Sequence, residues 1–181
     1  MNMKLIAPLC LIAVPVAAAA CPPVPDQSVR IAELVAELKA AESQEAAAPV
    51  NAALWELWLD APDEIAQAML DEGMARRSNF DFLGARRALD RLVEYCPDYA
   101  EGYNQRAFAS YLARDLEAAL VDLDRTLEIL PTHIGALSGK ALTLIGLGRN
   151  DDAQDVLRAA LALNPWLQER ALLVEPDGTD L

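Results

Sequence analysis

The chain has 181 residues, and its 28 acidic against 15 basic side chains give a formal net charge of −13 at pH 7. An acidic surface repels nucleic acid and anionic lipid headgroups, which are bound through basic patches, so we expect neither class of partner. Apolar residues make up 54% of the sequence. Once an N-terminal leader is set aside, about 160 residues remain, which suits one domain.

The first segment, residues 1–20, has the features of a signal peptide. Lys4 gives a positive start, an apolar stretch covers residues 5–16, and the four alanines that follow are residues after which a signal peptidase cuts. Two prolines interrupt the stretch, whereas a retained span needs about twenty continuous apolar residues. We therefore expect cleavage and export, to the periplasm or outside the cell, with no membrane span left afterwards. An uncleaved anchor is the alternative.

Two cysteines remain after such a cleavage, Cys21 and Cys96. An even pair in an oxidising compartment favours a disulfide, which here would tie the N-terminal tail to the end of a repeat. Two alternatives stay open. Cys21 follows three alanines and resembles the lipid-modified cysteine of a bacterial lipobox, although Ala18 stands where leucine is usual. In the other alternative both thiols are free.

Residues 21–27 form a proline-rich tail, and residues 28–65 are predicted to hold two helices. The first would run over residues 28–47, with apolar side chains at helical spacing on one face, until Pro49 interrupts it. The second would run over residues 51–60. The pair has the length of one repeat of the kind described next, but its register is shifted. We interpret it as a degenerate N-terminal repeat that caps the stack; a free-standing arm is the alternative.

A period of 34 residues runs through most of the remaining chain. Four columns keep it: small residues (Gly73, Ala107, Ala141), alanines (Ala85, Ala119, Ala153), leucines (Leu89, Leu123, Leu157) and prolines (Pro97, Pro131, Pro165). Such a period is typical of a two-helix unit that stacks into a solenoid. Proline cannot continue a helix and so closes each unit, while the small residues let the two helices approach closely. The sequence therefore predicts an all-α fold with about three clear units.

These columns resemble those of the tetratricopeptide repeat family. The resemblance implies a right-handed solenoid of helical hairpins, with repeats over residues 66–99, 100–133 and 134–167. The tryptophan usual near the start of a repeat is missing, which leaves the fold assignment unchanged. A short helix over residues 168–175 is expected to cap the last exposed apolar face. Residues 176–181 form an acidic tail that we expect to be disordered.

In this family the first helix of each repeat lines a concave groove that binds a peptide or a helix. Carried onto this chain, the resemblance implies a set of partner-binding residues: Arg77, Asn104, Gln105, Phe108, Tyr111, Leu142 and Ile145. Amides can hydrogen-bond a peptide backbone, and aromatic rings offer rigid apolar area. A groove filled by the chain's own terminal segment is the alternative. The basic clamp with which some members hold a C-terminal carboxylate is missing, because its positions hold Leu70, Met74, Gln105, Gly135 and Gly139.

Little in the sequence suggests catalysis. The single histidine, His133, is placed in a turn between repeats, and no metal-ligand spacing, phosphate loop or nucleophile motif occurs. We expect Asp98 and Glu101 to form a capping box, Thr132 to cap the next helix, and Asp122 to lie on a solvent face.

The sequence thus favours a non-catalytic adaptor of the bacterial cell envelope, without cofactor or metal, that binds another protein in its groove. A lipid-anchored assembly factor and a structural subunit of a larger complex are the alternatives. The oligomeric state stays open.

Overall fold

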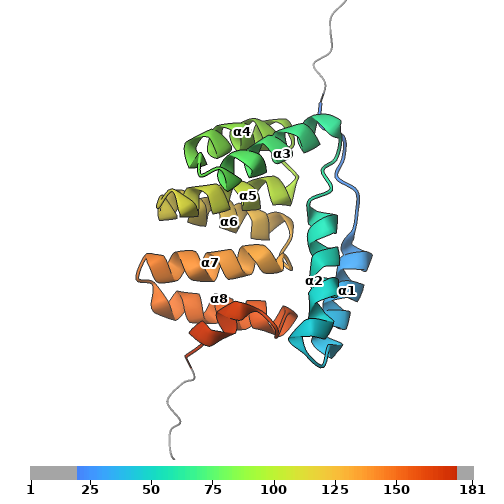
Figure 1. Cartoon of the computed structure of the whole chain (residues 1–181), viewed down its shortest axis with the longest axis vertical. Coiled ribbons are helices and arrows are strands. Elements are labelled where there is room, and N and C mark those ends of the chain that lie inside the picture. The colour runs from blue at the N-terminus through green and yellow to red at the C-terminus, as the bar shows by residue number, and fades with distance from the viewer. Residues whose placement is uncertain (1–19, 175–181) are drawn as a thin grey trace, which may run out of the picture.

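A computed structural model describes residues 20–174 of the chain, and all the regular secondary structure in that range is helical (Figure 1). In chain order the elements are α1 (Ser28–Ala40), α2 (Gln44–Trp58), α3 (Glu64–Ser78), α4 (Phe82–Tyr95), α5 (Ala100–Leu112), α6 (Leu116–Ile129), α7 (Ile134–Gly146), α8 (Asn150–Leu163) and the 3₁₀ helix η1 (Gln168–Leu172). The signal peptide and the acidic tail predicted from the sequence lie outside the described residues, apart from Ala20.

Helices α3 to α8 form three hairpins stacked one on the next, with α3 on α4, α5 on α6 and α7 on α8 (Figure 1). Each hairpin also packs on its neighbour, through α4 with α5 and α6 with α7. The predicted all-α solenoid of tetratricopeptide type is therefore confirmed.

The small-residue column has a direct steric cause. A Cβ atom added at Gly73 would lie 2.6 Å from Cγ of Leu89, far inside van der Waals contact. In the next repeat the equivalent Ala107 packs against Leu123, and both are buried. A side chain larger than alanine at these positions would push the two helices of a hairpin apart.

The turn inside each hairpin contains one residue in the left-handed region of backbone space. These residues are Phe80, Arg114 and Gly148, with φ of 62°, 65° and 74°. They keep the 34-residue period. Only glycine adopts this conformation without strain, so two of the three turns carry a backbone cost.

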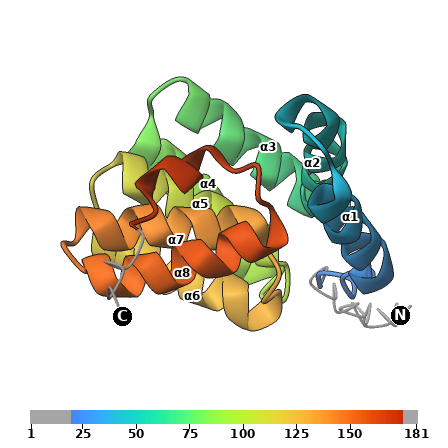
Figure 2. The same cartoon turned by 90° about the horizontal axis from the view of Figure 1, so that it is seen from below.

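The N-terminal helices depart from the sequence prediction. We expected them to stack as a degenerate repeat, whereas α1 and α2 form a hairpin that runs across the repeats, along the edge where their helices end (Figures 1 and 2). The break between them lies at residues 41–43 rather than at Pro49, because Ser43 caps α2 by accepting the backbone N–H of Ala46 at 3.2 Å. Pro49 is accommodated inside α2.

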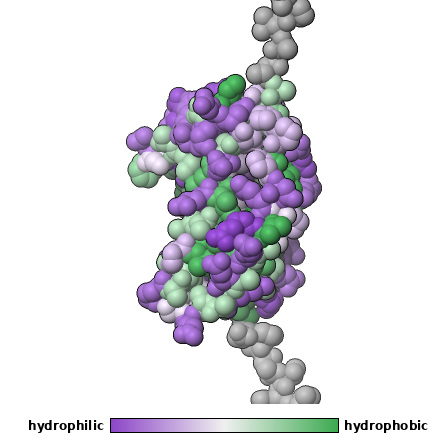
Figure 3. All heavy atoms as spheres, turned by 90° about the vertical axis from the view of Figure 1, so that its right-hand side faces the viewer, coloured by the Kyte–Doolittle hydropathy of each residue, from purple (hydrophilic) through white to green (hydrophobic). Residues whose placement is uncertain are grey.

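Large apolar side chains account for this placement. Leu38, Leu54 and Trp58 of the hairpin are buried in one cluster with Ile134, at the start of α7. Partly buried Leu163, at the end of α8, packs against the same cluster. The hairpin thus buries its apolar side on the edge of the stack, and its outward face is mostly hydrophilic (Figure 3).

The segment after α8 also differs from the prediction. Where a short capping helix was expected over residues 168–175, the described residues form a 3₁₀ helix of five residues. It is held beside α8 by side-chain bonds to the backbone: Gln154 Nε2 donates to the Leu172 carbonyl at 3.1 Å, and an Arg158 N–H donates to the Val174 carbonyl at 3.3 Å. Trp166 packs against the apolar cluster that the N-terminal hairpin forms with Ile134. Within residues 20–174, no helix is both long and apolar enough to span a bilayer.

A candidate binding cavity on the concave face

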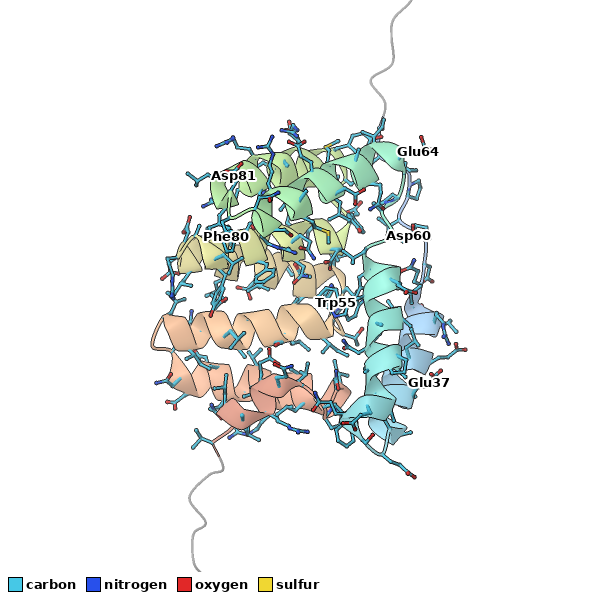
Figure 4. The ribbon with its side chains drawn as sticks, viewed as in Figure 1. Glu37, Trp55, Asp60, Glu64, Phe80 and Asp81 are labelled. Carbon is cyan, nitrogen blue, oxygen red and sulfur yellow. A yellow bond between two sulfur atoms is a disulfide. The ribbon has the colours of Figure 1, made fainter. Side chains whose placement is uncertain are left out.

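The inner face of the repeats and the N-terminal hairpin together enclose a cavity of about 490 Å³. Its walls come from α2, α3, α5 and α7, and from Leu167 and Glu169 beyond α8. Trp55 extends from α2 toward the repeats (Figure 4), and it lines the cavity together with Trp58. Cavities of several hundred cubic ångströms are the usual size of sites for small ligands or short segments.

Six of the seven residues that the family resemblance implied lie in the wall of this cavity: Arg77, Asn104, Gln105, Phe108, Tyr111 and Leu142. They come from three successive inner helices, α3, α5 and α7. Ile145 is not among them. It packs against Leu120, Leu144 and Ala153, so it belongs to the interior of the stack.

The cavity floor is organised by a buried carboxylate, Glu101, whose side chain is 1% exposed. The side-chain amides of Asn104 and Gln105 both donate to it, the former at 3.1 and 3.2 Å. His133 completes the set, with Nε2 at 2.7 Å from Oε2 of Glu101. A buried carboxylate without such donors would destabilise the fold, so the three donors are what makes its burial tolerable.

His133 is held in one tautomer by its two neighbours. Its Nδ1 accepts the backbone N–H of Ala136 at 3.1 Å and so caps α7. Nε2 must therefore carry the proton that is donated to Glu101. The imidazole ring also stacks on Trp58, with 4.1 Å between ring centroids, which joins this pair to the N-terminal hairpin.

Among residues 20–174, Arg77 is the only basic residue in the cavity wall. Its guanidinium lies 4.5 Å above the ring of Phe108, and its Nη1 donates to Oε1 of Gln105. Burial lowers the pKa of Arg77, and the negative charge of Glu101 partly offsets this effect. Glu101 does not form an ion pair with it: among residues 20–174, no carboxylate oxygen lies within 4.0 Å of this guanidinium.

The hairpin that forms one wall of the cavity is fastened at two points. Tyr99 donates its hydroxyl to the carbonyl of Trp58 at 2.6 Å, and burial, together with nearby acidic charges, raises the pKa of Tyr99. Cys21 forms a disulfide with Cys96, with 5.2 Å between their Cα atoms. The second fastening joins the tail that leads into α1 to the turn between α4 and α5.

Three sequence predictions about local contacts are wrong. Glu101 does not complete a capping box with Asp98, because it is buried against His133. The cap of α7 is His133 and not Thr132. Asp122 is buried rather than on a solvent face, since Arg106 reaches it with N–O distances of 2.6 and 2.8 Å. Glu101 and Asp122 are each held by a side chain from outside their own helix, His133 and Arg106 respectively. Thr132 is replaced as the cap by the next residue along the chain.

The cavity residues of α2, namely Asn51, Trp55 and Trp58, could not be placed from the sequence. Their role depends on the hairpin lying across the repeats, and the periodicity of the sequence does not predict that placement. The one sequence feature that pointed to these residues is the presence of two tryptophans within four residues. Within the described part of the chain, no group of three or more histidine, cysteine or acidic side chains is arranged to hold a metal ion.

Comparison with known proteins agrees with this architecture. The chain is 36% identical over 88 residues to a TPR repeat-containing protein of Rhizobium etli, a match that covers 49% of the chain and 38% of that relative. The TPR2B domain of yeast Sti1, solved in its pHsp70 complex, superposes with a TM-score of 0.53 and 26% identity, over 54% of this chain and 78% of that one. The chain is thus similar, in sequence and in fold, to proteins of the tetratricopeptide repeat family.

A further tetratricopeptide structure shows the shared fold. The first such domain of Spaghetti (RPAP3), bound to an HSP90 peptide, superposes with a TM-score of 0.59 at 16% identity, over 60% of this chain and 86% of that one. No family model matches the chain. The chain spans well under half the length of the curated relatives it matches first, at 38% of each.

Proposed function

We propose that this tetratricopeptide protein is a non-catalytic adaptor of the bacterial cell envelope, which holds a segment of another protein in its concave cavity. The observation that supports the proposal is the set of apolar and aromatic side chains in the cavity wall. Phe108 is 45% exposed there, and Tyr111 and Leu142 line the same cavity. Exposed aromatic residues in a preformed pocket are typical of protein-binding surfaces.

Export is the second part of the proposal. The signal-like residues 1–20 support it, and so does the disulfide between Cys21 and Cys96, because such bonds persist in oxidising compartments. The same bond counts against the lipid-anchored alternative. A lipid-modified cysteine has its sulfur in a thioether, so Cys21 cannot carry a lipid and pair with Cys96 at once.

The binding proposal is tested by crosslinking capture from envelope preparations of the native host, with wild type beside a Phe108→Ala, Tyr111→Glu double variant. We expect wild type to capture a partner that the variant loses. The matched control is Val121→Ala, because Val121 is 68% exposed and lies on α6, outside the cavity. Equal capture by wild type and a folded double variant would exclude the cavity as the binding surface.

Localisation is tested separately, with the full-length chain carrying a C-terminal tag. We expect the tagged protein in the soluble periplasmic or secreted fraction, shortened by about twenty residues through signal cleavage. Full-length protein in the cytoplasm would contradict export. Membrane attachment that survives high salt and requires Cys21 would restore the lipid-anchored alternative.

A further inference from the structure

We infer that the cavity binds a peptide segment that carries an acidic side chain next to a large apolar one, with the carboxylate held by Arg77. This inference deepens the proposed function and rests on it. It differs from recognition of a C-terminal carboxylate, because the positions of that clamp hold no basic residue here.

The first argument is that Arg77 forms no ion pair within the described chain, because the nearby charge of Glu101 acts on it without direct contact. Its side chain is partly buried in the cavity wall, and its one hydrogen bond within the described chain goes to a neutral amide, that of Gln105. A guanidinium has five N–H donors in a planar fork that suits a carboxylate. A carboxylate from a ligand would supply the counter-charge that residues 20–174 do not place within 4.0 Å of it.

The second argument is that the network beneath holds Arg77 in place. Glu101 takes the amide N–H groups of both Asn104 and Gln105, which fixes the orientation of each amide. The oxygen of Gln105 is thereby left to accept from Arg77, while Phe108 supports the face of the guanidinium. A cation positioned before binding loses little conformational entropy when the ligand arrives.

The third argument comes from the opposite wall. Trp55 and Trp58 of α2 line the cavity, as do Phe108 and Tyr111 of α5. Aromatic rings offer rigid apolar area, so this part of the site would receive the large apolar side chain of the segment.

The charges in the wall also give the segment a direction. Within the described chain, the only carboxylate that lines the cavity is Glu169, beyond α8, whereas Arg77 belongs to α3 at the other end of the repeats. An acidic side chain is attracted at one end and repelled at the other. The acidic residue of the ligand therefore lies at the α3 end, and the rest of the segment extends toward α7.

The experiment is a selection from random dodecapeptides displayed on phage with their C-termini fused to the coat protein, so that no free C-terminal carboxylate takes part. The target is the oxidised mature chain. We expect wild type to enrich peptides with aspartate or glutamate beside phenylalanine, tryptophan or leucine. The Arg77→Glu variant is expected to enrich lysine or arginine in place of the acid. The control Arg87→Gln, an exposed arginine outside the cavity, should keep the wild-type consensus.

A second measurement changes the ligand and compares wild type with one variant of the protein. One selected peptide is compared with its copy in which the acid is replaced by the matching amide, through quenching of tryptophan fluorescence from Trp55 and Trp58. We expect the amide copy to bind wild type at least about tenfold more weakly, the usual effect of losing a charged hydrogen bond. The two copies should bind Arg77→Gln equally.

The outcomes separate this inference from the function on which it rests. Peptides that bind in the cavity without an acidic residue, or an amide copy that binds wild type as tightly as the acid, would overturn the inference and leave the adaptor function standing. Failure to select any peptide would overturn both. Peptides that still bind a Phe108→Ala, Tyr111→Glu variant would place the site outside the cavity and overturn both as well.

Discussion

Oε2 of Glu101 lies 2.7 Å from Nε2 of His133, and the two side chains are 1% and 0% exposed. The contact joins α5 to the turn before α7, 32 residues later. His133 also caps α7 and stacks on Trp58. One buried pair therefore connects two repeats, the start of a helix and the N-terminal hairpin that forms the cavity wall.

We predict that His133→Ala lowers the free energy of unfolding by about 3 kcal/mol, because it removes one of the three side chains that donate to the buried carboxylate of Glu101 and leaves α7 without its cap. The measurement is urea unfolding followed by circular dichroism. Thr132→Ala, next to it on the exposed turn, serves as the control and should change little. A His133→Ala variant as stable as wild type would show that the pair contributes nothing to the fold.

The repeats could be predicted because their determinants recur along the chain. Gly73 with Leu89, and Ala107 with Leu123, are the same contact one repeat apart, so the 34-residue spacing reports the packing directly. The inner helices then follow from the register, which is why six of the seven implied groove residues line the cavity.

The rest of the site depends on contacts that occur once. Trp58 meets His133 only because the hairpin crosses the stack, and Arg106 reaches Asp122 from the helix before it. Neither pair of residues recurs at the 34-residue spacing. In both contacts, polar side chains are buried at positions that the sequence pattern predicts to be exposed to solvent. Single contacts between distant segments leave no periodic signal, so the hairpin, the buried pair and the cavity could be found only in three dimensions.

We predict that Cys21→Ser destabilises the oxidised protein. The disulfide closes a segment with a sequence separation of 75 residues, and the chain-entropy model assigns such a cross-link about 4 kcal/mol. Urea unfolding with and without dithiothreitol measures the effect. The reductant should destabilise wild type and leave Cys21→Ser unchanged. Equal responses of the two proteins to dithiothreitol would mean that the bond is not formed in solution.

The left-handed turn residues give a prediction in the opposite direction. Arg114 adopts φ of 65° in the turn where the third repeat has Gly148, at 74°. Arg114→Gly should therefore stabilise the chain by about 1 kcal/mol, and Gly148→Ala should destabilise it by a similar amount. A Cβ atom at Gly148 would meet nothing within 4 Å, so strain in the backbone is the only cost. Thermal unfolding of the two variants checks both signs, and two shifts in the same direction would refute the explanation.

The helix caps predict how stability depends on acid. Asp63 caps α3, Asp81 caps α4 and Asp115 caps α6. The pKa of Asp63 is lowered mainly by the backbone N–H of Ala66, and the pKa of Asp81 mainly by that of Gly84. For Asp115 the larger cause of the lowered pKa is its hydrogen bond with Arg86, followed by the backbone N–H of Ala118. All three carboxylates are thus harder to protonate in the folded chain than in the unfolded one.

The sign of the pH dependence follows from these lowered pKa values. As pH falls below about 4, the unfolded chain takes up these protons first, so the stability that the caps contribute is lost as pH passes down through the folded pKa values. A triple variant with Asp63→Asn, Asp81→Asn and Asp115→Asn keeps a capping oxygen at each site, because asparagine caps helices about as well as aspartate. Its urea midpoint should therefore fall less steeply than that of wild type in this range. Asp98→Asn changes an exposed carboxylate that caps no helix, and it should follow the wild-type curve. If the triple variant lost stability as steeply as wild type, the three caps would not be the cause of the acid sensitivity.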